Sequence, residues 1–252
     1  MTARFSLAGR TIIVTGANTG IGQGIAVAIA RAGGSVLGVG RSSMEETERL
    51  VAAEGARFTA LTCDLADAAG ARTMFDAAWE AHGPIDGLVN NAGIIRRADA
   101  VDFTEADWDE VMDVNLKTLF MLSQAFGRKL IAESRRGKIV NIASMLSFQG
   151  GIRVASYTAS KHGVLGVTRL LACEWASRGI NVNAVAPGYI ETNNTDALRK
   201  DPDRSTAILA RIPAGRWGRP EDIGDAAVFL LAPASDYMHG AVVPVDGGWL
   251  AR

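Results

Sequence analysis

The chain has 252 residues and a formal net charge of −1, and 48% of its residues are hydrophobic. A chain of this length and composition can form one α/β domain with a large buried core. Because both signs of charge are spread along the sequence, it lacks the basic stripe that nucleic acid or an anionic membrane surface requires, and the expected partner is a small neutral or acidic molecule.

Short β-branched runs alternate with amphipathic stretches along the chain. This pattern predicts an α/β fold: a single domain over 1–252, built on a Rossmann-type, doubly wound parallel sheet of about seven strands. Long helices are expected near 107–133 and 156–178. The stretch at about 188–220 has no predicted strand and follows a strand end, which is typical of a substrate lid, with a disordered loop as the alternative. The predicted strands lie near 11–15, 35–39, 58–62, 85–89, 138–143, 180–186 and 241–245.

A glycine-rich segment, Thr15–Gly22, follows the first strand. Glycine here lets the backbone approach a pyrophosphate and aims helix N-terminal amides at it. The spacing is G-x-x-x-G-x-G rather than the commoner G-x-G-x-x-G, so a simple strand-to-helix turn is the alternative. Polar residues also stand at the next strand ends. Asp64-Leu65 can meet an adenine amine, and Asn90–Gly93 follows the fourth strand, where we expect Asn90 to connect strands.

The second strand ends in Val39–Ser42 and indicates which dinucleotide binds. NAD-binding folds usually place a carboxylate about 20 residues after the glycine loop to accept the ribose 2′-OH, and none is available here. Gly40 leaves room, so Arg41 and Ser42 can grip a 2′-phosphate. The alternative is that Arg41 only stacks on the adenine. We expect both NAD and NADP to bind, with NADP modestly favoured.

Tyr157 and Lys161 stand four residues apart in a predicted helix, which places a phenol and an ammonium on one face. A tyrosine must lose roughly three pKa units to act as a base at neutral pH, and a lysine at about 4 Å can supply the corresponding ~4 kcal/mol. An isolated Tyr-x-x-x-Lys is more often a surface pair. Ser144, at a strand end, places a hydroxyl where a carbonyl substrate would sit, and Asn115 is an amide within the long helix.

Together with Pro187-Gly188, these motifs resemble the short-chain dehydrogenase/reductase superfamily over the whole chain. The resemblance implies that Tyr157 is the acid/base, and that Lys161 lowers the tyrosine pKa and binds the nicotinamide ribose. Ser144 would hydrogen-bond the carbonyl, and Asn115 would hold a water in a proton relay. Besides Tyr157 and Lys161, the implied cofactor contacts are Gly16, Asn18, Thr19, Gly20, Ile21, Gly22, Arg41, Ser42, Asp64, Leu65, Asn91, Ala92, Gly93, Pro187, Gly188, Ile190 and Thr192.

Within the superfamily, four segments resemble the branch described as 2-deoxy-D-gluconate 3-dehydrogenase or 2-dehydro-3-deoxy-D-gluconate 5-dehydrogenase. This resemblance implies oxidoreduction between a secondary alcohol and a ketone on a six-carbon sugar acid, and it favours NAD. The alternatives are a gluconate 5-dehydrogenase, a 3-oxoacyl-thioester reductase, or a dinucleotide sensor without turnover. The four segments are 142–153, 186–195, 211–218 and 245–252.

A sugar acid requires a cation for its carboxylate, and arginine's planar fork suits a bidentate grip. Arg153 precedes Tyr157 by four residues, and Arg96 follows the Asn-Asn-Ala-Gly strand end, so these two are the candidates. Each can also be a simple surface charge. Gln149 and Asn194 are expected to bind substrate hydroxyls.

The remaining expectations concern compartment and assembly. Cys63 and Cys173 are expected to be buried thiols in the cytoplasm, because they lie far apart in apolar segments. No secretory segment, membrane span or metal site is expected. The resemblance implies a homotetramer, in which small residues at Ala159, Gly163 and Gly166 permit close helix approach between subunits or pack within one subunit.

Overall fold

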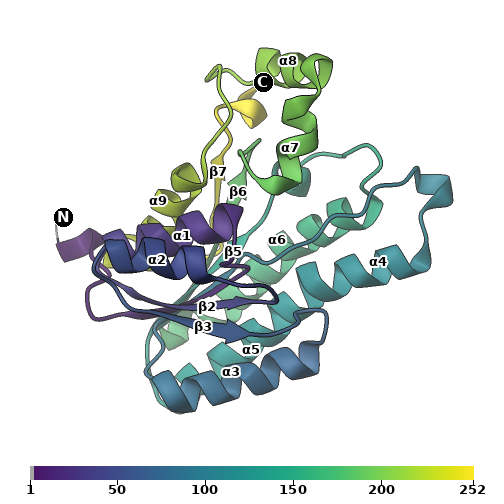
Figure 1. The fold of residues 1–252 in the computed structure, drawn as a ribbon. Helices are drawn as coiled ribbons and strands as arrows, with labels where there is room; N and C mark the ends of the chain where they lie inside the picture. Colours follow the sequence, from purple (N-terminus) through teal and green to yellow (C-terminus); the bar gives the residue numbers. More distant parts are fainter. Residues whose placement is uncertain (1–2) are drawn as a thin grey trace.

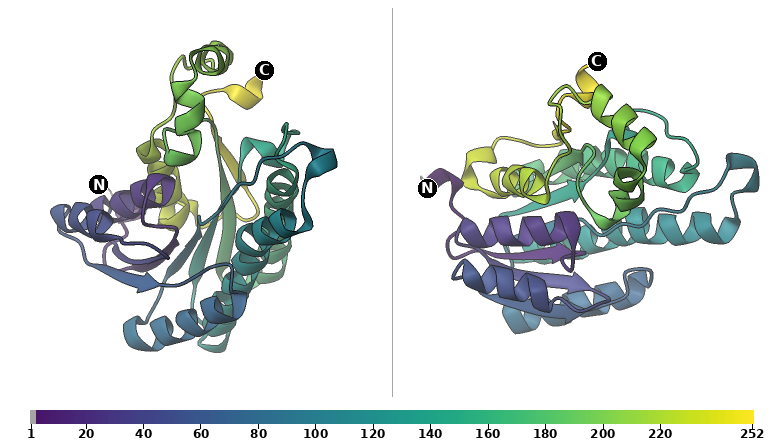
Figure 2. Two further views of the ribbon diagram at one scale, coloured as in Figure 1. Left: turned by 45° about the vertical axis from the view of Figure 1, so that its right-hand side comes forward. Right: turned by 45° about the horizontal axis from the view of Figure 1, so that its top comes forward.

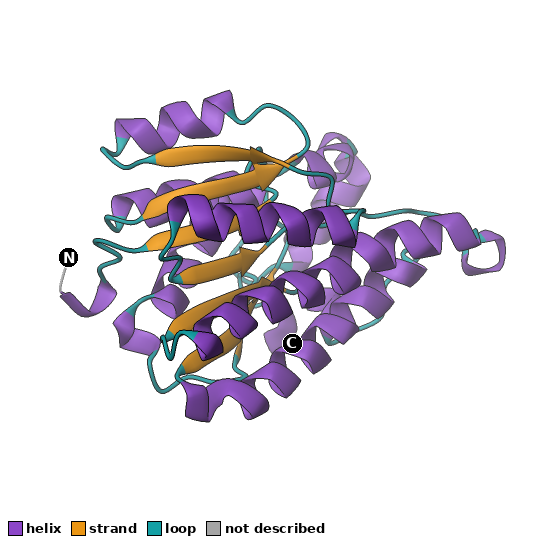
Figure 3. Cartoon of the chain, turned by 90° about the horizontal axis from the view of Figure 1, so that it is seen from below, coloured by secondary structure: helices purple, strands orange, loops and turns teal. Residues whose placement is uncertain are grey.

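The computed structural model describes residues 3–252, which form a seven-stranded sheet with helices on both faces (Figures 1 and 3). The strand order is β3-β2-β1-β4-β5-β6-β7, and every neighbouring pair is parallel. The predicted doubly wound sheet is therefore confirmed. The strands are β1 (Thr11–Thr15), β2 (Ser35–Gly40), β3 (Phe58–Thr62), β4 (Gly87–Asn90), β5 (Gly137–Ile142), β6 (Ile180–Pro187) and β7 (Val242–Val245).

Side chains of β1 show why the sheet needs helices on both faces. Ile12 and Val14 pack in one apolar cluster, and Ile13 packs in another on the opposite face, because successive side chains of a strand point to opposite sides. The first cluster is covered by α1 (Gly20–Arg31), α2 (Glu45–Ala53) and α9 (Pro220–Leu231), and the second by α3 (Ala68–His82), α5 (Thr118–Ala132) and α6 (Ala155–Trp175) (Figure 1).

The strand order reverses at β1, which pairs with β2 on one side and β4 on the other. In open α/β sheets, ligands bind outside the carboxyl ends of the strands at this switch point. Helix α1 begins there and is held against α9 by a close crossing. A Cβ on Gly24 would lie 2.5 Å from the Cβ of Pro220 and 2.8 Å from its backbone carbonyl, so only glycine allows this approach.

The helix expected at 107–133 is interrupted, which corrects the prediction. Helix α4 (Glu105–Met112) and α5 are separated by a π-helical turn at Asp113–Lys117. Turns of this kind occur as single insertions within helices, frequently at functional sites. Asn115 lies in the turn with 1% of its surface exposed, and its side chain bonds to the backbone of Ile94. That long-range contact is invisible to helical periodicity.

The segment expected to be a lid consists of two helices rather than a disordered loop. Helices α7 (Asn193–Lys200) and α8 (Pro202–Arg211) project beyond the carboxyl end of the sheet (Figures 1 and 2). Asp201 separates them and caps α8, since its carboxylate accepts hydrogen bonds from the amides of Asp203 and Arg204, both at 3.1 Å. Apolar residues anchor the segment in a small cluster with Met145, Ile208, Ile212, Trp217 and Trp249.

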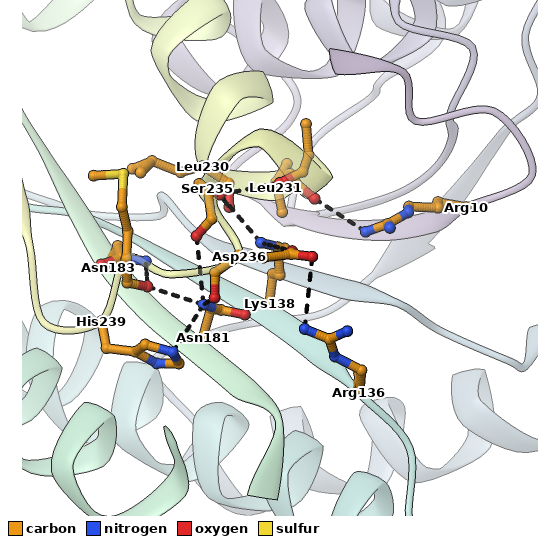
Figure 4. A network of polar contacts seen from close by, with 12 residues as sticks. Arg10, Arg136, Lys138, Asn181, Asn183, Leu230, Leu231, Ser235, Asp236 and His239 are labelled. Carbon is orange, nitrogen blue, oxygen red and sulfur yellow. Dashed lines mark hydrogen bonds and ion pairs between the residues drawn. The ribbon is translucent and has the colours of Figure 1, made fainter. Parts of the chain in front are cut away.

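A polar network connects β5 and β6 at the opposite end of the sheet to the loop after α9 (Figure 4). The Lys138 side chain, 5% exposed, donates to Ser235 Oγ at 3.1 Å and lies 2.8 Å from Asp236. Asn181 Nδ2 donates to the carbonyls of Asp236 and Met238. Burial lowers the pKa of Lys138, against the influence of Asp236. These bonds satisfy a buried ammonium and fix the strand ends far from the switch point.

The cysteines depart from expectation. Cys63 is half-buried and Cys173 is exposed on α6, and the two are free. The prediction of burial is therefore wrong for Cys173, because the apolar stretch around it continues onto the outer face of the helix. Within residues 3–252, no helix is both long and apolar enough to cross a membrane.

Candidate active site

Three adjoining cavities follow the carboxyl edge of the sheet, with volumes of about 360, 140 and 400 Å³. The middle cavity shares Ile21, Asn91 and Gly93 with the first. It shares Ser144, Tyr157, Gly188, Asn194 and Thr195 with the third. The cavities therefore form one crevice, in which three of the predicted catalytic residues, Ser144, Tyr157 and Lys161, line the middle cavity between two larger spaces.

The first two cavities bring together nearly all of the predicted cofactor residues. The first is lined by Gly16, Asn18, Thr19, Ile21, Gly22, Arg41, Ser42, Asp64, Leu65, Asn91, Ala92 and Gly93. The second adds Tyr157, Lys161, Pro187, Gly188, Ile190 and Thr192. The exception is Gly20, which lines neither. A Cβ at Gly20 would lie 3.2 Å from Thr192 Cγ2, so the segment that leads into α7 packs closely against the glycine loop.

Asn91, which follows β4, holds the glycine loop in place through hydrogen bonds to its backbone. Its Nδ2 donates to the carbonyl of Thr15 at 2.8 Å, while Thr15 Oγ1 accepts from the amides of Asn91 and Ala92. Gly16 has a φ of +67°, and a Cβ on Gly22 would collide with the Gly16 carbonyl. A side chain would therefore break the cradle that a pyrophosphate needs. Asn90 connects strands as expected, because its Nδ2 donates to Asn141 Oδ1 at 2.9 Å.

The residues predicted to bind the 2′-phosphate, Arg41 and Ser42, line the first cavity together with Asn18 and Asp64. Asn18 Nδ2 donates to Ser42 Oγ at 2.8 Å, and Arg41 lies 3.7 Å from Asp64 with both side chains more than half exposed. A Cβ on Gly40 would only touch Asn18, at 3.4 Å. The Arg41 guanidinium is thus loosely paired and lines the same cavity as Ser42, an arrangement that suits a phosphate monoester.

The Tyr157–Lys161 pair lies on the inner face of α6, and Ser144 lies just after β5. Lys161 is 4% exposed, and its Nζ donates to the carbonyl of Ile142 at 2.7 Å. Nζ also lies 5.6 Å from the centroid of the Tyr157 ring. Ser147, a residue the sequence did not single out, donates to the Lys161 carbonyl at 2.7 Å and so ties the helix to the β5 end.

Burial shifts the pKa values of both Tyr157 and Lys161, and neighbouring groups oppose the shift of Tyr157. Burial raises the pKa of Tyr157, while a hydrogen bond with Ser144 and the positive charge of Arg97 lower it. Burial lowers the pKa of Lys161 to about 8. The sequence pointed to Lys161 as the cation that acts on the phenol. In the structure, however, burial raises the pKa of Tyr157, and the cation that opposes this rise is Arg97, which the sequence analysis missed.

The Asn115 side chain is fully engaged. Its Oδ1 accepts from the amide of Ile94 at 2.8 Å, and its Nδ2 donates to the carbonyl of Ile94 at 3.0 Å and to Ser160 Oγ at 3.3 Å. A Cβ on Gly93 would lie 3.3 Å from Asn115 Oδ1 and 3.8 Å from Lys161 Nζ. The amide therefore holds the strand end next to the catalytic lysine.

The third cavity has an unusual charge. Its lining contains the arginines Arg97, Arg204 and Arg211 and no aspartate or glutamate. Gln149 and Asn194 line it as expected. In a chain whose net charge is −1, such a space favours an anionic ligand.

The two arginines predicted to bind the carboxylate lie elsewhere. Arg96 forms a bidentate pair with Glu110, at 2.8 and 2.9 Å, and Arg153 pairs with Asp99 at 3.1 Å. Neither lines the third cavity. The sequence could not separate Arg96 from Arg97, because adjacent residues of an extended segment point to opposite sides.

A family profile described as Enoyl-(Acyl carrier protein) reductase matches residues 16–250. The chain belongs to the short-chain dehydrogenase/reductase superfamily. A superfamily member described as 2-dehydro-3-deoxy-D-gluconate 5-dehydrogenase, from Dickeya dadantii (strain 3937), is 56% identical over 248 residues, 98% of each chain.

Solved structures of superfamily members agree with this fold. A protein from Agrobacterium tumefaciens, assigned as a 2-deoxy-D-gluconate 3-dehydrogenase with bound NADP, is 62% identical with a TM-score of 0.95 and covers 99% of each chain. A gluconate 5-dehydrogenase from Burkholderia cenocepacia J2315, in complex with NADP and tartrate, is 38% identical with a TM-score of 0.93, over 99% of this chain and 98% of that one.

Proposed function

We propose that this protein is an NAD(P)-dependent dehydrogenase that interconverts a secondary alcohol and a ketone on a six-carbon sugar acid of the 2-deoxy- or 2-keto-3-deoxy-gluconate type. One observation carries the proposal. Tyr157 and Ser144 stand where a dinucleotide-sized crevice meets a cavity lined by three arginines and no carboxylate. The sugar-acid dehydrogenases similar to this chain support the same substrate class.

The first cavity fits the dinucleotide. Its glycine loop would direct helix N-terminal amides toward a pyrophosphate. A Cβ on Gly22 would collide with the Gly16 carbonyl of the same loop, so this close turn needs glycine. Arg41, Ser42 and Asn18 would hold the 2′ end of the adenosine, and Lys161 the nicotinamide ribose. When bound, the nicotinamide supplies or accepts the hydride.

Side chains of the protein would then transfer the proton and stabilise the developing charge. In the direction of reduction, Ser144 would donate a hydrogen bond to the substrate carbonyl, and Tyr157 would transfer its phenolic proton to the same oxygen as negative charge develops there. Burial keeps the phenol protonated at neutral pH, which suits proton donation. Oxidation of the alcohol requires the phenolate, which the hydrogen bond with Ser144 and the charge of Arg97 would stabilise.

The segment 188–220, with α7 and α8, would serve as the substrate lid. The protein would act in the cytoplasm as a homotetramer. Two free cysteines fit a reducing compartment, and α6 carries an exposed Leu170 and an open Gly166 on its outer face, which suit an isologous helix contact.

The test is absorbance of reduced cofactor with a panel of substrates. The proposal expects turnover of 2-keto-3-deoxy- or 2-deoxy-gluconate with NADP or NAD, in preference to gluconate and to 3-oxoacyl thioesters. Turnover of thioesters alone would identify the reductase alternative. Tight dinucleotide binding without turnover of any panel member would identify a sensor.

A further inference from the structure

The lid helix α8 presents two arginines to the third cavity. Arg204, Ile208 and Arg211 are spaced i, i+4 and i+7, so they share one face of the helix. Ile208 is 7% exposed and packs into the apolar cluster with Met145 and Trp249. This packing turns the face toward the crevice, and both arginines line the cavity.

Arg211 is held in a defined orientation. Its guanidinium carbon lies 4.0 Å from the centroid of the Trp249 ring, and Trp249 is itself 6% exposed and packed edge-on against Tyr189, with ring centroids 4.9 Å apart. A guanidinium stacked on a rigid indole keeps its N–H edge free for a planar anion.

Neither cation has a protein counter-ion in the described part of the chain. No carboxylate lies within 4.0 Å of Arg204 or Arg211 between residues 3 and 252, whereas Arg199 and Arg216 of the same segment pair with Asp196 and Asp222. Two unpaired arginines that line an acid-free cavity favour an anionic ligand there, such as a carboxylate.

We propose that Arg204 and Arg211 bind the carboxylate of the substrate, so that the acid end lies under α8 while the reacting carbonyl lies at Tyr157 and Ser144. This inference rests on the proposed function. Arg97, whose charge acts on Tyr157, belongs to the reacting end. The specificity for acids is thus carried by the lid and is separate from the proton chemistry.

The test compares a sugar acid with its uncharged methyl ester in wild type, Arg204→Ala, Arg211→Ala and Arg211→Gln. Each variant is expected to raise KM for the acid by about tenfold or more with a smaller change in kcat, because binding common to ground and transition states is lost. The KM for the ester should stay within about twofold of wild type. Competitive inhibition by tartrate should weaken in parallel with the acid.

Lys200→Ala is the matched control, because Lys200 lies on α7, its side chain is 76% exposed, and it pairs with Asp196 away from the cavity. Thermal unfolding of each variant verifies folding, and Arg211→Gln retains most of the packing on Trp249. Unchanged KM for the acid in the arginine variants, with wild type still preferring acid over ester, would overturn the inference while leaving the proposed function intact. Wild type that turns over no sugar acid would instead reject the proposed function.

Discussion

Arg97 is the second group, besides Ser144, that lowers the pKa of the Tyr157 phenol. Burial raises the pKa of Tyr157, whereas Ser144 and Arg97 act in the opposite direction. Alcohol oxidation needs the phenolate, so its rate rises with pH through this pKa. Arg97→Ala should raise the pKa and move the rising limb of the oxidation rate to higher pH, as a pH series of kcat/KM would show. The control Arg153→Ala removes an exposed arginine paired with Asp99, and a limb at the same pH in both variants would contradict the assignment.

Tyr157 itself should be indispensable for turnover and dispensable for binding. Tyr157→Phe removes the only proposed proton donor, and general acid–base catalysis contributes about 10²–10⁴-fold. We expect kcat to fall by at least about 100-fold while the dinucleotide dissociation constant, measured by fluorescence titration, changes little. Appreciable turnover by this variant would reject the mechanism.

The lowered pKa of Lys161 makes the free energy of unfolding depend on pH. Its pKa is lowered from 10.5 to about 8 in the fold, so protonation favours the unfolded chain and the free energy of unfolding rises as pH increases from about 8 to 10.5. The full difference corresponds to about 3 kcal/mol. Lys161→Met lacks this term, so any stability advantage of the variant over wild type should shrink across that pH range in urea unfolding experiments. A constant difference between the two proteins would contradict the shift.

We expect Arg41 to discriminate between the two dinucleotides. A guanidinium beside Ser42 can form charge-assisted hydrogen bonds with a 2′-phosphate, worth about 1.5–3 kcal/mol. Arg41→Ala should therefore weaken NADP binding by at least about tenfold and leave NAD binding nearly unchanged. Calorimetric titration with both cofactors provides the measurement, and equal losses would show that the arginine only stacks on adenine.

At the scale of elements, the sequence predicted the strands well, because β-branched runs buried on both faces are distinct from the amphipathic helices. It missed features that depend on tertiary contacts. The π turn at Asp113–Lys117 is one of these, since it accompanies the Asn115 contacts with the Ile94 backbone. For α8 a local signal was present: Asp201-Pro202 is an N-cap followed by proline at the first helical position.

The candidate site likewise contains residues that the sequence could single out and residues that it could not. Motif spacing was enough to single out the residues predicted to act in catalysis and cofactor binding, and all of them except Asn115 and Gly20 line the first two cavities. The arginines proposed to bind the substrate carboxylate could not be singled out, because ion pairing with nearby acids decides which arginines are available. Arg96 and Arg153 are occupied by nearby acids, and sequence alone does not show such partners.

The crossing of α1 and α9 should reverse the usual effect of replacing a helical glycine. Gly→Ala in an exposed helix interior commonly stabilises by about 1 kcal/mol. At Gly24 the new methyl would meet the backbone of Pro220 at 2.8 Å, and overpacking of this kind costs about 1–3 kcal/mol. We expect Gly24→Ala to lower the free energy of unfolding measured in urea. A gain in stability would show that the two helices can separate freely.

At the scale of the whole molecule, we expect the proposed homotetramer to depend on the outer face of α6. Gly163 packs inward, since a Cβ there would lie 2.7 Å from Leu116 of the same chain, whereas Gly166 has nothing within 4 Å. Leu170, one turn further, is 49% exposed. Wild type should scatter light as a homotetramer at micromolar concentration, and Leu170→Glu should lower the mass. A monomeric wild type would reject the proposed assembly.

The first cavity, at the glycine loop, and the third cavity, which α8 lines, have no lining residue in common. The first is lined by residues between 16 and 114 and the second by residues between 95 and 249. The residues proposed to set dinucleotide preference, Arg41 and Ser42, and those proposed to recognise the acid, Arg204 and Arg211, therefore lie in different halves of the chain. Recombination between related genes in the loop joining α5 to β5 would exchange the two traits as separate units, so new pairings can arise in a single crossover rather than through many point mutations.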